Sequence, residues 1–172
     1  MKDFGGKALF LDRSDINTDE IIPAKYLTEN TKMALQPFIL EDLKLGGFNP
    51  RTDIQGKGAI ITRANFGCGS SREHAVWVFE VNDINIVIAE SFARIFRQNM
   101  YNCGMLAVEL LPSEIDAITA LGNEVEIAVD LATCTISAKN GAKELSFTFS
   151  INEFDKELVE NGGWLTYADN KY

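Results

Sequence analysis

The sequence Asn-Phe-Gly-Cys-Gly-Ser-Ser-Arg-Glu-His at residues 65–74 decides how the rest of the chain is arranged. An apolar, β-branched run at residues 59–62 precedes it, and an apolar run with helical periodicity at residues 75–79 follows it. Gly67 and Gly69 allow backbone angles that other residues rarely adopt, so the chain can turn sharply between the two runs. The pattern therefore predicts a strand, a glycine-rich turn and a helix.

Ser70 stands where the N-cap of this helix is expected. With Glu73 it fits the Ser-x-x-Glu capping box, which predicts that the helix begins directly after Ser70. A helix N-terminus carries unpaired N–H groups and a partial positive charge, so it favours an anion. Arg72 has the wrong charge for the first turn of a helix unless a carboxylate or phosphate joins it. The stretch thus indicates an anion site, and a simple helix cap without a ligand is the plainer alternative for Ser70.

Common glycine-loop motifs fit this stretch poorly. A dinucleotide-binding loop requires a third glycine where the chain has Arg72, and a phosphate-binding P-loop requires a lysine that is absent. A hydrolase nucleophile elbow places its glycines on both sides of the serine, which Ser70 and Ser71 do not satisfy. Cys68 is either a reactive thiol or, as we favour, a small residue in a tight turn. For His74 we favour a local hydrogen bond on the helix over a catalytic role.

Composition excludes several classes of protein. The chain has 172 residues, 46% of them hydrophobic, and a net charge of −9. This charge argues against binding to nucleic acid or to a membrane surface, and no apolar run approaches the ~20 residues of a membrane span. The first residues lack the apolar core of a signal peptide, so we expect a cytoplasmic protein. Three scattered cysteines argue against a disulfide framework and against an iron–sulfur site in this chain, and a single histidine excludes a metal site built from paired histidines.

The remaining pattern predicts an α/β fold in which a βαβ core with parallel strands is followed by an antiparallel annex. Strands are expected at residues 7–11, 58–62, 84–89 and 105–110, with helices at 71–82 and, capped by Ser91, at 92–100. Alternating polar and apolar residues then predict strands at 124–129, 133–137 and 144–149, and a final helix that opens with a capping box at 150–153.

Two segments before the glycine turn have less regular patterns. The acidic stretch at residues 12–20 is a solvated loop or a cation site built from oxygens, and its spacing does not match an EF-hand. Residues 24–50 form a long connection, which makes them a candidate for substrate selection or partner contact. Arg94 and Arg97 are expected to form a solvated or partner-facing stripe.

Three blocks of sequence, in this order and spacing, resemble the small subunits of 3-isopropylmalate dehydratases, which are separately encoded versions of the aconitase swivelling domain. The blocks are Asp15-x-Asn17-Thr18-Asp19-x-Ile21-Ile22-Pro23, the stretch from Asn65 to Ala75, and Ile88-Ala89-x-Ser91-Phe92-Ala93-Arg94-Ile95-Phe96. The tail from Phe149 to Gly162 is similar as well, so the resemblance covers nearly the whole chain and implies one swivelling domain over residues 1–172.

The resemblance implies half of an enzyme. In this family a large subunit carries a [4Fe–4S] cluster on three cysteines, and the small subunit closes over that site in a heteromeric, cytoplasmic hydro-lyase. The reaction interconverts 2-isopropylmalate and 3-isopropylmalate, hydroxy-dicarboxylates of leucine biosynthesis, by dehydration and rehydration. The resemblance therefore implies no cofactor in this chain and a large-subunit partner that holds the cluster.

Residue roles follow from the same resemblance. Ser70 corresponds to the serine base, and Asp19 to an acidic residue that orients a catalytic group. Ser71 and Arg72 correspond to residues that hold a substrate carboxylate, and Arg72 can do so with two parallel hydrogen bonds.

The substrate stays open at this point. Tyr26 and Leu27 are candidates for an apolar substrate pocket, since aconitase has an arginine in this region and this chain does not. Lys25 or Lys32 could instead reach an extra carboxylate, so a homoaconitate, citramalate or dimethylmalate hydro-lyase is an alternative. A noncatalytic carboxylate-binding module is another. Residues 46–58 look unlike the usual family sequence, and no role is assigned to them.

Overall fold

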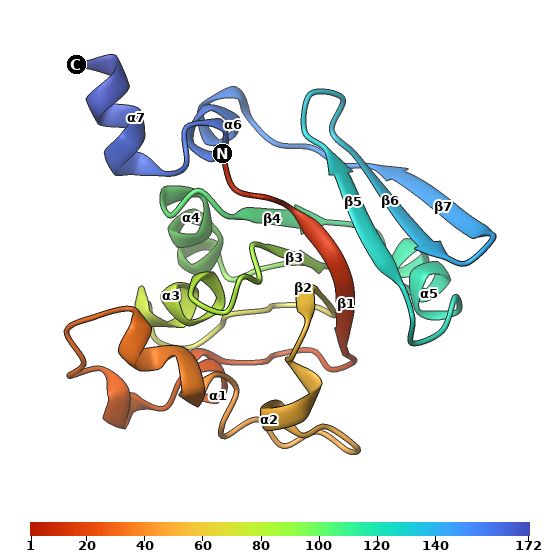
Figure 1. The fold of residues 1–172 in the computed structure, drawn as a ribbon, viewed down its shortest axis with the longest axis horizontal. Helices are drawn as coiled ribbons and strands as arrows, with labels where there is room; N and C mark the ends of the chain where they lie inside the picture. Colours follow the sequence, from red (N-terminus) through yellow and green to blue (C-terminus); the bar gives the residue numbers. More distant parts are fainter.

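A computed structural model describes residues 1–172 and contains one seven-stranded mixed sheet in the order β4-β3-β2-β1-β5-β6-β7 (Figure 1). The four parallel strands are β1 (Gly5–Leu11), β2 (Lys57–Thr62), β3 (Ile86–Ala89) and β4 (Leu106–Glu109). The antiparallel strands are β5 (Glu126–Asp130), which pairs with β1, then β6 (Thr135–Asn140) and β7 (Lys143–Thr148). The predicted α/β fold, with a parallel core and an antiparallel section, is confirmed.

Two crossover helices connect the parallel strands. The helix α3 (His74–Glu80) joins β2 to β3, and α4 (Arg94–Asn102) joins β3 to β4. All four residues of β3 are buried, as expected for a parallel strand that is covered on both faces. Figure 1 shows α3 and α4 beside the parallel strands, with α4 also packed against a later helix, α6 (Glu153–Glu160).

The other helices are peripheral. They are α1 (Thr18–Ile21), the 3₁₀ helices η1 (Ala24–Tyr26) and η2 (Met33–Phe38), α2 (Pro50–Asp53), α5 (Pro112–Thr119) and α7 (Trp164–Lys171). None of the helices is long and apolar enough to cross a membrane.

Four sequence predictions about helices were wrong. The helix after the glycine turn begins at His74, with Glu73 rather than Ser70 at its N-cap. Ser91 does not cap α4, because its hydroxyl accepts a hydrogen bond from the Asn65 N–H at 2.8 Å. The cap of α6 is Asn152, which accepts from the Asp155 N–H at 2.8 Å and replaces the predicted capping box.

The fourth correction concerns the end of the chain, where α6 was expected to be the final helix. The chain instead turns at Gly162 and Gly163, both with positive φ, and continues as α7. Figure 1 shows α7 projecting away from the sheet, and none of its residues is buried. An exposed helix of this kind has no strong apolar periodicity, which is why the sequence pattern did not predict it.

Three loops meet at the carboxyl ends of the parallel strands. The Gly67 N–H donates to the Ile16 carbonyl at 2.8 Å, and the Thr18 N–H donates to the Cys68 carbonyl at 2.8 Å, which joins the loop after β1 to the loop after β2. The Ala93 N–H donates to the Phe66 carbonyl at 3.0 Å and joins the loop after β3. Open parallel sheets bind their ligands at this edge, so the fold places any site among these loops.

Candidate active site

The glycine turn is shaped by close contact with α4. Gly67 has φ +83°, and a Cβ at this position would lie 2.2 Å from a carbon of the Phe96 ring. Gly69 has φ +96°, and a Cβ there would meet the Thr18 hydroxyl at 3.4 Å. Both glycines are therefore needed for the backbone path that the sequence predicted, and Gly67 is also needed for the close approach of the turn to α4.

The acidic stretch is not a simple loop, because it contains α1. Asn17 caps this helix through a capping box with Glu20: the Asn17 side chain accepts from the Glu20 N–H at 3.0 Å, and the Glu20 carboxylate accepts from the Asn17 N–H at 3.2 Å. Arg13 forms an ion pair with the same Glu20 carboxylate. These contacts fix Thr18 and Asp19, the first residues of α1, against the glycine turn.

A cavity of about 250 Å³ opens between the glycine turn, α1 and the first turn of α4. Ser70, Ser71 and Arg72 line it, and so do Thr18 and Arg94. The structure thus brings three of the predicted site residues, Ser70, Ser71 and Arg72, to one cavity, and it does so at the carboxyl edge of the parallel strands.

Arg72 and Asp19, both predicted as site residues, form an ion pair with 2.8 Å between Nη1 and the carboxylate oxygen. The Arg72 side chain is 13% exposed, whereas the Asp19 side chain is 64% exposed. The Arg72 Nε is buried and has no hydrogen-bond partner in this chain. Arg72 therefore has one unpaired N–H donor beside the cavity. A buried donor without a partner favours the binding of a ligand that can accept a hydrogen bond from it.

Two further sets of donors line the same cavity. The Thr18 hydroxyl is buried and has no hydrogen-bond partner. The first turn of α4 also faces the cavity, and its N-cap, Ala93, offers no side-chain acceptor, so the N–H groups of Ile95 and Phe96 are unpaired. The helix N-terminus at the cavity is thus that of α4 and not, as predicted from the sequence, that of α3.

Sequence reasoning missed Thr18 and Arg94 as cavity residues. Both lie within the blocks of sequence that resemble the dehydratase small subunits, and this resemblance could have identified them as site residues. The hydrophobic pattern and the residue spacing predicted no role for either. Arg94 was expected on a solvated or partner-facing stripe; it is exposed and lines the cavity. Arg97 instead forms a surface ion pair with Glu109 at 2.9 Å.

Tyr26 and Leu27 are not among the residues that line this cavity. Tyr26 stacks on Phe38, with ring centroids 3.9 Å apart and an interplanar angle of 8°. Lys32 forms an ion pair with Glu80, with 2.7 Å between Nζ and the carboxylate oxygen. This ion pair leaves Lys32 poorly placed to reach an extra substrate carboxylate. Substrate contact by Tyr26 and Leu27 stays a prediction for the assembled enzyme.

The cysteines and the histidine do not form a reactive or metal-binding group. All three cysteines are free thiols, and no three His, Cys, Asp or Glu side chains are grouped as metal ligands. Burial raises the pKa of Cys103 to about 11, and desolvation together with Asp15 also raises the pKa of Cys68. Because the three cysteines are not grouped together, the residues of this chain do not fit an iron–sulfur cluster. His74 packs against Trp77 with ring centroids 4.7 Å apart.

Comparisons with known proteins identify relatives of this chain. The aconitase C-terminal domain family matches residues 48–113, which include the glycine turn and the start of α4. The 3-isopropylmalate dehydratase small subunit 2 of Deinococcus radiodurans is 42% identical over 158 residues, covering 90% of this chain and 71% of that protein. The small subunit of Staphylococcus haemolyticus is 37% identical over 167 residues, covering 92% of this chain and 84% of that protein.

A solved structure shows the same fold. The crystal structure of 3-isopropylmalate dehydratase (leuD) from Methanocaldococcus jannaschii aligns with a TM-score of 0.80 and 28% identity, covering 98% of this chain and 94% of that chain. These similarities extend over most of both chains. This chain belongs to the family of 3-isopropylmalate dehydratase small subunits, which contains the aconitase C-terminal domain fold.

Proposed function

We propose that this chain is the small subunit of a heteromeric hydro-lyase that interconverts 2-isopropylmalate and 3-isopropylmalate in leucine biosynthesis. The observation that carries the proposal is the cavity in which Ser70, Ser71 and Arg72 meet unpartnered N–H and hydroxyl donors, in a chain of this family. A site rich in donors and poor in acceptors suits a substrate carboxylate.

The first task of this half-site is to hold that carboxylate. The Arg72 Nε, the Thr18 hydroxyl and the N–H groups at the start of α4 are the free donors. When a proton leaves the carbon next to a carboxylate, negative charge spreads onto the carboxylate oxygens. Donors that are already in place hold the carboxylate and stabilise this charge without having to reorient.

Ser70 is the proposed base. A serine hydroxyl is a weak acid, so it needs a positive environment to act as an alkoxide. Arg72 and Arg94 line the same cavity and, with the α4 N-terminus, provide that environment from this chain. Ser71 lies next to Ser70 in the turn and is proposed to bind the carboxylate.

Asp19 has two proposed roles. Its ion pair orients Arg72 within the cavity. The same carboxylate is largely exposed, so it can also accept a hydrogen bond from a catalytic group of a partner and orient that group.

The proposal requires a large subunit. Since the residues of this chain do not fit an iron–sulfur cluster, we propose that the [4Fe–4S] cluster belongs to that partner. When bound, such a cluster supplies a Lewis acid for the substrate hydroxyl. The exposed positions of Ser70, Ser71 and Asp19 agree with a site that a second protein covers.

Substrate turnover by the reconstituted complex tests the proposal. The full chain is combined with the large subunit from the same organism, and the ultraviolet absorbance of the unsaturated product is followed with isopropylmalate, homocitrate and citramalate. We expect isopropylmalate to give the highest kcat/KM, and neither chain to be active alone. Turnover restricted to homocitrate or citramalate would assign this chain to a related hydro-lyase instead. Absence of turnover on all three compounds would contradict the proposed function.

A further inference from the structure

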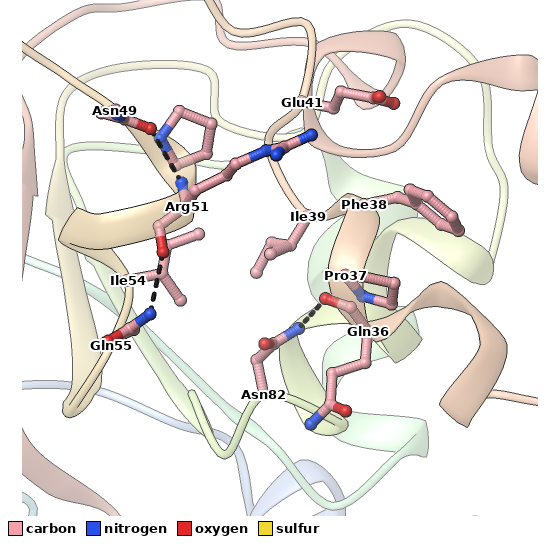
Figure 2. A pocket seen from close by; sticks show the side chains of 11 residues that line it. Gln36, Pro37, Phe38, Ile39, Glu41, Asn49, Arg51, Ile54, Gln55 and Asn82 are labelled. Carbon is pink, nitrogen blue, oxygen red and sulfur yellow. Dashed lines mark hydrogen bonds between the residues drawn. The ribbon is translucent and has the colours of Figure 1, made fainter.

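A second cavity, of about 630 Å³, lies between η2, α2 and the residues that follow α3 (Figure 2). It shares no lining residue with the cavity at the glycine turn. Its volume is in the range of about 300–1,000 Å³ that is typical of small-molecule sites. The proposed hydro-lyase chemistry does not use it.

Three amide side chains in this cavity, those of Gln36, Gln55 and Asn82, have an oxygen without a hydrogen-bond partner. The Nε2 of Gln36, the Nε2 of Gln55 and the Nδ2 of Asn82 donate to backbone carbonyl oxygens at 2.9, 3.0 and 2.7 Å. These bonds fix the orientation of each amide, because the reverse orientation would place two oxygens together. The amide oxygens accept no hydrogen bond from the chain, so a ligand that carries N–H groups can use them.

Glu41 adds a carboxylate to these acceptors. Its Oε2 is buried and has no hydrogen-bond partner. The preceding residue, Leu40, has φ +56°, a conformation that is strained for a branched side chain, and its N–H donates to the Ile21 carbonyl at 2.8 Å. Backbone strain of this kind persists where the surrounding structure holds a residue in place, and it is concentrated at functional sites. The fold thus keeps a carboxylate oxygen without a hydrogen-bond donor at the wall of the cavity.

Arg51 provides the opposite charge. Figure 2 shows its side chain extending across the cavity toward the side on which Glu41 lies. Arg51 forms no ion pair with Glu41 or with any other acidic residue in the chain, although both side chains line the cavity. The cavity therefore has one guanidinium and one carboxylate that form no ion pair with each other or with another side chain.

Apolar side chains complete the wall. Ile39 and Ile54 are buried and contribute to the cavity lining, and Phe38 lies on the side of Glu41 (Figure 2). A ligand that satisfies all three parts of the wall carries an ammonium group, a carboxylate and an aliphatic side chain.

We propose that this cavity is a binding site for a zwitterionic α-amino acid with an aliphatic side chain. The ammonium group is bound by Glu41, the carboxylate by Arg51, and the side chain packs on Ile39 and Ile54. Binding at this site is independent of the proposed hydro-lyase function and can be measured without turnover.

The site is connected to the segment that is predicted to contact substrate. Phe38 stacks on Tyr26 at 3.9 Å, and the pKa of Tyr26 is raised by desolvation and by the neighbouring Glu41 carboxylate. A ligand that contacts Phe38 and Glu41 therefore changes the surroundings of Tyr26, which makes the Tyr26 ring a spectroscopic reporter of binding.

Binding to the full chain tests the proposal, with L-leucine as the probe and two analogues that each lack one charge. 3-Methylbutylamine lacks the carboxylate, and 4-methylpentanoate lacks the ammonium group. We expect calorimetry to show that L-leucine binds at least tenfold more tightly than either analogue, and NMR to show that L-leucine shifts the ring resonances of Tyr26 and Phe38.

Two charge-removing variants locate the site. Glu41→Gln should remove the preference for L-leucine over 4-methylpentanoate, and Arg51→Met should remove the preference over 3-methylbutylamine. The matched controls, Glu144→Gln and Lys143→Met, lie on β7 outside this cavity and should bind L-leucine like the wild-type chain. Arg51 is exposed, so Arg51→Met keeps the test valid even if Glu41→Gln fails to fold. The proposal is overturned if L-leucine does not bind, if 4-methylpentanoate or 3-methylbutylamine binds equally well, or if folded Arg51→Met binds like the wild-type chain.

Discussion

Gly67 is the residue at which the backbone of the candidate active site is most constrained. Two effects act there: a φ of +83° and the Phe96 ring, which lies 2.2 Å from the place of a Cβ. We expect Gly67→Ala to lower the free energy of unfolding by about 3 kcal/mol, because left-handed strain and overpacking add together. Chemical denaturation measures this loss.

Gly56 separates the two effects. Its φ of +75° is similar, but nothing lies within 4 Å of the place of a Cβ. Gly56→Ala should therefore cost about 1 kcal/mol from backbone strain alone. Equal losses in the two variants would show that contact with Phe96 does not constrain the glycine turn.

Arg72 serves the site through a donor that lysine does not have. Lysine could replace the ion pair to Asp19, but it has no counterpart of the Nε that is buried without a partner. We expect Arg72→Lys to raise the KM of the reconstituted enzyme about tenfold, the factor that corresponds to about 1.4 kcal/mol, without loss of stability.

Arg97→Lys is the matched control for this substitution. Arg97 forms an exposed ion pair with Glu109 and does not line the cavity, so this variant should leave the KM unchanged. An unchanged KM in Arg72→Lys would contradict the assignment of the Nε to the substrate carboxylate.

At the scale of elements, Glu80 connects three segments of the chain. It is the last residue of α3, and its carboxylate pairs with Lys2 at 2.8 Å and with Lys32 at 2.7 Å. Desolvation raises the pKa of Glu80, but hydrogen bonds from the two lysines outweigh it, so the pKa lies below its ordinary value of 4.5. The pair of lysines also offsets the unfavourable position of a carboxylate at a helix C-terminus.

The pH dependence of Glu80→Gln follows from this lowered pKa. A carboxylate with a lowered pKa in the folded state stabilises the protein above its unfolded pKa, and the contribution disappears as the pH falls through the folded pKa. We expect Glu80→Gln to cost about 1 kcal/mol at pH 7 and progressively less below pH ~4.5. Glu144→Gln on β7, where no ion pair is present, should cost nothing at either pH. A loss for Glu80→Gln that does not change with pH would contradict the ion-pair account.

The strands were predictable from sequence, but the beginnings of the helices were not. Apolar, β-branched runs predicted the parallel strands, because a strand that is buried on both faces consists almost entirely of apolar residues. The capping box at Ser70 is a local sequence pattern, and the structure does not form it. The positive φ of Gly69 and the ion pair between Arg72 and Asp19 keep residues 70–73 outside the helix. Propensity alone does not determine a boundary when tertiary contacts oppose it.

At the scale of the whole molecule, the candidate site depends on sheet topology. Thr18, Arg72 and Arg94 are far apart in sequence, and they meet because β1, β2 and β3 are adjacent and parallel, so that their following loops share one edge. The family-like blocks contained all three residues, yet only the assembled sheet shows that the hydroxyl of Thr18 and the Nε of Arg72 lack partners. Hydrogen-bond satisfaction is a property of the folded chain and cannot be deduced from a pattern of residues.

The central claim, that this chain supplies the base of a two-subunit hydro-lyase, is tested most directly by kcat/KM of the reconstituted complex with Ser70→Ala. Loss of a positioned base typically costs ~10²–10⁴-fold, so we expect ~10³-fold lower kcat/KM on isopropylmalate, while the affinity for the large subunit stays unchanged. Ser150→Ala, at an exposed serine outside the cavity, should retain full activity. Near-wild-type kcat/KM in Ser70→Ala would contradict the account.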